Sequence, residues 1–301
     1  YHASESHPAL LYYGRFGTDR MRVVEAEYEN GRLLPVRGKS CSTQAIPHLA
    51  DKFKSFHSFA LADLDQIYTK PVIAEAETFS ATTLKNGVFL NEGEKGFTFH
   101  ALPDLAQIAP GFGVTLTDFD GDGILDLFAG QNFHHPQIET GRMSGGLGAF
   151  LRGNDDGTFE EVWPLESGLA LPQDVTAVAT SDLNGDSWPD LLVASNDGPL
   201  RCFLNQGESR FPQRAMLALT LAGPAGNPDA LGARVMADPS TPSLATGGSG
   251  YLSQASATRF LARAPGSPLA LDVVWPDGSR SSHTLDGGER QATIRQAASA
   301  K

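Results

Sequence analysis

The sequence predicts an all-β protein made of small sheets, and three observations lead to this prediction. Glycine and proline account for 32 and 19 of the 301 residues, which exceeds their average share of about 12% and indicates many tight turns. Short apolar and aromatic runs alternate with these turns, as short strands do. A pattern of strand, acidic loop and strand also occurs twice, beginning at Val114 and at Val178.

The repeated pattern organises the first expected domain, residues 1–215. An apolar strand follows each acidic loop, at Ala149 and Cys202, and an earlier copy of that strand begins at Val88. Each copy continues through a turn into a further aromatic strand, near Phe97, Phe159 and Phe211. Units of four short strands separated by Gly/Asp turns are typical of β-propeller blades. We therefore expect three blades, at about residues 9–103, 111–165 and 174–214.

The first expected blade departs from the other two. Its first two strands are residues 9–13 and 21–26, and the loop between them keeps a single carboxylate. A segment at about residues 35–80 predicts a helical insertion, because Pro47 suits a first helical turn and an apolar face recurs at helical spacing, at Phe53, Phe56, Phe59 and Leu61. Asp63 and Asp65 mimic the start of a calcium loop, but no glycine or later acid follows. We expect these two to lie on a solvated helix face.

The chemistry is concentrated in two nine-residue loops with oxygen-bearing side chains at positions 1, 3, 5 and 9. Alternating carboxylates repel one another unless a cation lies among them. A flexible loop of oxygen ligands favours Ca²⁺ over Mg²⁺, which demands tight octahedral geometry. We therefore expect two calcium ions. The expected ligands are Asp118, Asp120, Asp122, the Ile124 carbonyl and Asp126 in the first loop, and Asp182, Asn184, Asp186, the Trp188 carbonyl and Asp190 in the second.

These loops differ from an EF-hand, which has a bidentate Glu at position 12, where this chain has Ala129 and Val193. Position 9 must then close the site, and the flanking segments look like strands. The first loop is expected to bind more tightly, because the second has an amide at Asn184 and Ser187 in place of a loop glycine. The competing interpretation is a pair of Asp/Gly-rich turns without an ion.

These loops resemble the calcium-binding FG-GAP (VCBS-type) repeats of integrin-α-like β-propellers. Residues 216–301 resemble the ASPIC/UnbV domain that follows such repeats in the cartilage acidic protein family and its bacterial relatives. The segments behind the second resemblance are 226–235, 250–254 and 274–278, and segments 25–28, 34–37 and 139–143 also resemble the bacterial members. The sequence departs from the family at the degenerate first loop and at residues 260–263, where a glycine-rich turn is usual.

The resemblance implies a secreted, cell-surface or periplasmic scaffold that is stabilised by calcium and serves adhesion or recognition. Its ligand would be a protein or a carbohydrate. The net charge of −12 argues against nucleic acid as a partner, since phosphate attraction needs a basic patch. No apolar run is long enough to span a membrane. Cys41 and Cys202 match no metal or redox motif, and whether they pair stays open.

A hydrolase or lyase that acts on carbohydrate or an ester, with its site on the propeller face, is the main alternative function. A purely structural module is a third. His134 and His135, near Glu139, are candidates for a metal or acid–base role, although adjacent residues on an extended chain point opposite ways. Trp163, Trp188 and Trp275 are candidates for sugar stacking or, more simply, for core packing. No nucleophile motif is evident.

Closure of the propeller poses a problem, because three blades are fewer than the four that a closed propeller needs. Open sheet edges favour aggregation. We expect that missing blades lie upstream in a longer precursor, since the chain begins at Tyr1 almost within a strand. In the isolated chain, a second copy or residues 216–301 are expected to cover the open edges.

Overall fold

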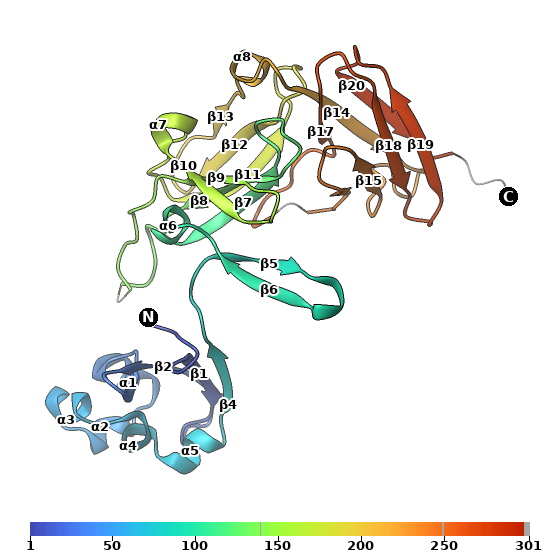
Figure 1. Cartoon of the computed structure of the whole chain (residues 1–301). Coiled ribbons are helices and arrows are strands. Elements are labelled where there is room, and N and C mark those ends of the chain that lie inside the picture. The colour runs from blue at the N-terminus through green and yellow to red at the C-terminus, as the bar shows by residue number, and fades with distance from the viewer. Residues whose placement is uncertain (139, 249, 298–301) are drawn as a thin grey trace. The chain divides into compact units, whose positions relative to one another are not determined.

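The computed structural model describes residues 1–138, 140–248 and 250–297 and is mostly β, with 37% strand and 14% helix. The chain divides into two compact units, Tyr1–Lys85 and Asn86–Lys301 (Figure 1). Among the described residues the strands form several small sheets, none of which closes into a barrel. In the same part of the chain, no helix has the length and apolar character needed to cross a bilayer.

The first unit combines one four-stranded sheet with five short helices. The sheet has the order β3-β2-β1-β4. Its strands are β1 (Ala9–Gly14), β2 (Arg22–Glu29), β3 (Arg32–Pro35) and β4 (Glu77–Ala81), and the helices are α1 (Lys39–Ala45), α2 (Leu49–Lys52), α3 (Phe56–Ala60), α4 (Leu64–Tyr68) and α5 (Lys70–Ala74). Tyr12 and Val24 from the sheet pack with Ile46, Leu49 and Ile67 from the helical segment in one core.

The helices lie where the sequence predicts a helical insertion, but they do not form one amphipathic helix. Phe53 and Phe59 are buried, whereas Phe56 and Leu61 are 67% and 61% exposed. The reason is that the chain leaves the helix at Phe53 and begins a new one at Ser55, which caps α3. Asp63 does not lie on a helix face either. It caps α4 in a capping box and pairs with Arg32 at 2.6 Å.

Residues 9–103 do not form the single four-stranded blade that the sequence predicts. The strands β5 (Gly87–Asn91) and β6 (Phe97–Ala101), with the 3₁₀ turn η1 (Gly93–Lys95) between them, pair only with each other. The sheet of the first unit instead recruits β3 and β4 beside β2 and β1. Alternating apolar residues specify that β5 is a strand, but they do not specify which strand it pairs with.

Two sheets carry the acidic loops in the second unit. The first has the order β10-β9-β8-β7, and the second has the order β11-β12-β13. Their elements are α6 (Asp104–Gln107), β7 (Gly111–Thr117), β8 (Asp126–Gln131), β9 (Ala149–Gly153), β10 (Phe159–Val162), α7 (Pro164–Ser167), β11 (Val175–Ser181), β12 (Asp190–Ser195), β13 (Arg201–Phe203) and α8 (Gly207–Arg210). A fourth strand near Phe211 was expected in the second of these sheets. At this point in the sequence the chain forms the helix α8, and Phe211 stacks on Trp188 instead of entering a strand.

The remaining strands form two further sheets, β17-β14-β20 and β16-β15-β18-β19. They are β14 (Ala215–Ala222), β15 (Arg234–Ala237), β16 (Ser243–Leu244), β17 (Arg259–Arg263), β18 (Leu269–Val274), β19 (Arg280–Leu285) and β20 (Gln291–Arg295). Leu217 and Leu219 from one sheet share a core with Val235, Leu271 and Val273 from the other. Within the described residues, none of these strands pairs with the sheets that carry the acidic loops.

The cap of α4 yields a first prediction. Replacing Asp63 by Ala removes both the capping box and the ion pair with Arg32, and we expect this to lower the free energy of unfolding by about 1 kcal/mol. The Asp63→Asn variant retains a capping oxygen and should lose less. Urea unfolding followed by circular dichroism measures both, and equal losses would contradict a capping role.

Candidate metal centre

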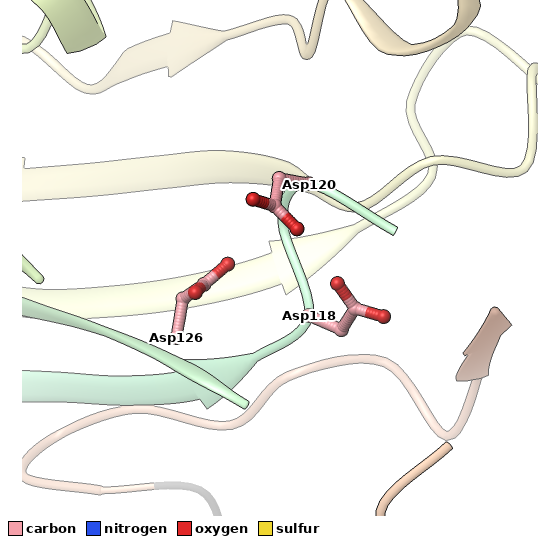
Figure 2. Close-up of side chains that lie close together, drawn as sticks. All are labelled: Asp118, Asp120 and Asp126. Atoms are coloured by element: carbon pink, nitrogen blue, oxygen red, sulfur yellow. The ribbon is translucent and has the colours of Figure 1, made fainter. Parts of the chain in front are cut away.

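Three buried carboxylates meet in the loop between β7 and β8. Oxygens of Asp118, Asp120 and Asp126 all lie within 4.8 Å of one another (Figure 2). These residues are 4%, 7% and 1% exposed. Buried carboxylates are costly unless they are paired or hold a cation. This group is therefore able to hold a metal ion.

Backbone amides hold Asp118 in place at the start of the loop. Its Oδ1 accepts hydrogen bonds from the amides of Gly121 and Asp122 at 2.6 and 3.2 Å, and its Oδ2 accepts one from Gly123 at 2.8 Å. Gly121 and Gly123 have φ angles of +77° and +93°, a conformation that favours glycine. A Cβ at Gly121 would also lie 2.8 Å from the Trp188 ring. The loop glycines are thus required by both backbone conformation and space.

Asp126 closes the loop and ties it to the neighbouring strand. Its Oδ2 accepts from the amide of Phe119 at 2.9 Å, and its Oδ1 accepts from the amide of Gly153, at the end of β9, at 3.1 Å. One carboxylate therefore fixes the loop, β8 and β9 relative to one another.

The pKa of Asp118 is raised from its ordinary value of 3.8 to about 7, mainly by burial; the amide hydrogen bonds lower it, and the charges of Asp122 and Asp120 raise it. Burial also raises the pKa of Asp126 to about 7, with the charges of Asp120 and Asp118 adding to it. The pKa of Asp122 is raised as well, again mainly by burial. Burial is therefore the main cause of these raised pKa values, and the repulsion between carboxylates that the sequence predicts adds to it.

Two arginines that sequence reasoning missed provide a counter-charge. Arg214 donates to Oδ1 of Asp120 at 2.5 Å, and the Nε of Arg152 lies 3.2 Å from Oδ2 of the same residue. Arg214 also approaches Asp122 at 3.9 Å. Nothing in the local loop pattern indicates either residue, because Arg214 lies 94 positions away along the chain.

The second loop makes the same set of hydrogen bonds as the first. Asp182 accepts from the amides three, four and five residues later, at 2.8, 3.1 and 3.0 Å. Asp190 accepts from the amides of Leu183 and Asn205, both at 2.8 Å. At position 5, Asp122 and Asp186 each accept from the amide two residues later, that of Ile124 and that of Trp188. The two loops therefore share one backbone arrangement at an offset of 64 residues.

The side chains of the second loop differ from those of the first in charge and exposure. Asn184 is exposed, and its amide group donates to Asp186 at 2.8 Å. Gln291 donates to Oδ2 of Asp182 at 3.1 Å. Asp190 is fully buried, and burial raises its pKa. The residues of the second loop that correspond to the buried triad are Asp182, Asn184 and Asp190, so an amide replaces the middle carboxylate.

Ser187 occupies the left-handed position that Gly123 holds in the first loop. Its φ of +77° is uncommon for a residue with a side chain. Its hydroxyl donates to the carbonyl of Arg290 at 2.7 Å. In the first loop the carbonyl of Gly123 accepts from the amide of Thr241 at 2.8 Å. Both loops are thus bonded to segments that follow β14.

The other candidate residues do not gather into a site. The rings of His134 and His135 have centroids 6.5 Å apart, and Arg142 contacts Nδ1 of His134 at 3.2 Å. Glu139 lies outside the described residues. Trp188 and Trp275 are buried in cores at 1% and 3% exposure, where no sugar can stack, whereas Trp163 is 60% exposed.

Neither protein-family models nor curated proteins yield a match to this chain. The fold and the site define the class to which it belongs. It is a mostly-β protein with a buried acidic centre that is able to hold a metal ion.

The raised pKa values predict how stability depends on pH when metal is absent. Asp118 and Asp126 bind protons more tightly in the folded chain than in the unfolded chain, where their pKa is near 4. Their protonation therefore stabilises the fold at low pH, and this contribution is lost as pH rises from about 4 to about 7. We expect unfolding in EDTA to become easier across this range, and an Asp118→Asn variant to show a weaker trend.

Urea unfolding at a series of pH values measures both proteins. A stability that rises between pH 4 and pH 7 in EDTA, to the same extent in both, would contradict the raised pKa values.

Proposed function

We propose that this protein is an extracellular, calcium-stabilised scaffold that binds one ion in each acidic loop and serves adhesion or recognition. The observation that carries the proposal is the pair of loops with matching hydrogen bonds, the first of which holds three buried carboxylates within 4.8 Å. Loops without ions need no such crowding of buried acids.

The geometry of the first loop supports calcium as the ion. Calcium binds oxygen ligands at about 2.3–2.6 Å, so two oxygens on opposite sides of one ion lie at most about 5 Å apart. The carboxylates of the triad meet this condition. The amide hydrogen bonds to Asp118 and Asp126 orient these carboxylates before an ion arrives, while a bound ion replaces the protons that their raised pKa values favour.

The wider proposal concerns architecture and location. The strand orders of the sheet of β7–β10 and of that of β11–β13 support the propeller blades that the resemblance to FG-GAP repeats implies. The strands β14–β20 support the β-rich ASPIC/UnbV domain that we propose for residues 216–301. A protein or carbohydrate ligand, and a secreted, cell-surface or periplasmic location, belong to the same proposal. Ions at the contact between these sheets and the C-terminal strands would stiffen such a scaffold.

Calcium is expected to stabilise the chain. At a free concentration 100 times the dissociation constant, each site adds about 2.7 kcal/mol to the free energy of unfolding. Melting temperatures in excess EDTA, in calcium and in magnesium measure the effect. An unchanged melting temperature, with no calcium retained after dialysis, would refute the proposed function.

The two loops are expected to differ in strength. Asp120→Ala removes a buried charged ligand, whereas Asn184→Ala removes an exposed neutral one, so the first substitution should weaken calcium binding more. Asp120→Asn also removes the charge that the two arginines pair with but retains the size of the side chain, so it separates the loss of charge from the loss of packing. Isothermal titration with calcium decides, and equal effects of the alanine variants would contradict the order.

A further inference from the structure

The two sheets that carry the acidic loops differ by one strand at their outer edge. Gly153 at the end of β9 and Asn205 after β13 donate equivalent amide hydrogen bonds to the closing aspartates of their loops. The two strands also pair in the same way with the strand before them. Leu151 of β9 lies opposite Leu127 of β8, and Phe203 of β13 lies opposite Leu191 of β12. The strand β13 is thus the counterpart of β9. However, β10 covers β9, whereas no strand of the described residues covers the outer edge of β13.

A cavity of about 400 Å³ lies beside β13 and is lined by residues of both sheets. Phe203 from β13 and Leu191 from β12 face the first sheet, and with Val162 and Leu169 they line this cavity. The cavity is mostly apolar, and its floor reaches Asp120 and Asp126. Its size is typical of a site that binds a small molecule or a buried side chain.

Exposed apolar side chains lie on chain segments next to those that line the cavity. Leu200 and Leu204 flank β13 and are 62% and 56% exposed. At α7, Trp163 and Leu165 are 60% and 103% exposed, and Arg210 of α8, which lines the cavity, lies 3.9 Å from Glu166 of α7. A cluster of exposed apolar groups beside an open strand edge is typical of an interaction surface.

The covering strand of the first sheet shows what such an edge accepts. In β10, Phe159 lies opposite Gly153, and Glu161 lies opposite Leu151. These two side chains share one face of the sheet, because side chains alternate along a strand. Phe159 packs against the apolar cluster on that face. In a strand added to β13, the residue equivalent to Phe159 would lie opposite Asn205, and the residue equivalent to Glu161 would lie opposite Phe203. Both would be on the face of the sheet that borders the cavity.

Charge at the edge specifies the second of these positions. Arg201 lies two residues before Phe203 on the same strand face, and within the described residues its side chain makes no ion pair or hydrogen bond. Residues on a diagonal across two strands come within reach of long side chains. An acidic residue opposite Phe203 would therefore be able to pair with Arg201.

We propose that the outer edge of β13 binds an extended peptide segment of a partner protein, antiparallel to β13, by strand addition. A bulky apolar residue of the segment fills the cavity opposite Asn205, and an acidic residue two positions later pairs with Arg201. Backbone hydrogen bonds along β13 supply affinity, while the cavity and Arg201 supply the preference for an apolar-x-acidic pattern. This goes beyond calcium binding and names the partner class of the scaffold.

The probe is a labelled peptide with the sequence of residues 157–163, Gly-Thr-Phe-Glu-Glu-Val-Trp, titrated against the full chain by fluorescence anisotropy in calcium. We expect saturable binding that weakens about tenfold when the phenylalanine becomes serine or the second glutamate becomes lysine, a change of about 1.4 kcal/mol each. The Arg201→Glu variant should bind the original peptide about tenfold more weakly and recover binding to the lysine peptide. Arg280→Glu, at an exposed arginine of β19, should leave both affinities unchanged.

Hydrogen exchange locates the peptide, and protection of residues 201–204 is expected. Protection of β9 instead would mean that the peptide replaces β10, and a dimer that Leu204→Asp dissociates would assign the edge to a second copy. Either outcome, or no binding, overturns the proposal. Calcium titration of the same protein without peptide separates a failure here from a failure of the proposed function, because it measures calcium binding whether or not the peptide binds.

Discussion

The arrangement of the acidic sheets depends on the carboxylate that closes each loop. Asp126 accepts an amide hydrogen bond from its own loop and another from the end of β9, and Asp190 does the same for its loop and for Asn205. Both residues are almost fully buried. A buried carboxylate is tolerated only when it is fully hydrogen-bonded. The need to satisfy it therefore fixes three chain segments at one point in each sheet.

The same loops also join these sheets to the C-terminal strands. The carbonyl of Gly123 accepts from Thr241, the hydroxyl of Ser187 donates to Arg290, and Trp188 packs with Met216 of β14. Trp188 is itself a loop residue, so the conformation of the second loop decides whether this contact forms. An ion that orders the loops would consequently stabilise the contact with β14 and the segments after it, besides the sheet that supplies its ligands.

Local spacing predicted the acidic loops, since their expected ligands fall within nine residues and their turns place residues with positive φ at fixed positions. It also predicted the mostly-β content and the helical segment. Spacing carries no information on partners far along the chain, which is why Arg152 and Arg214 were missed. For the same reason the strand β5 was assigned to a blade that does not form.

The absence of the last strand has a different physical cause. Asn205 uses its side chain to bond the carbonyls of Phe119 and Pro189 and the amide of Gly207, which ends the extended chain after β13. Gly207 then begins α8 with a φ of +46°. Phe211, an aromatic residue that suits a strand, is drawn to the Trp188 ring instead. Tertiary contacts here override a local pattern that favours a strand.

The charges of the two sheets differ in a coordinated way that links the loops to the open edge. In the first sheet, Arg152 pairs with Asp120 of the loop and also with Glu160 of the covering strand at 3.1 Å. The equivalent positions in the second sheet hold Leu204 and Asn184, both neutral. Removing this loop charge removes the need for the arginine beside it, and Leu204 then cannot make the ion pair that Arg152 makes with Glu160 of the covering strand in the first sheet. The loss of one carboxylate from the second loop therefore accompanies the replacement of an arginine by Leu204 beside the uncovered edge of β13.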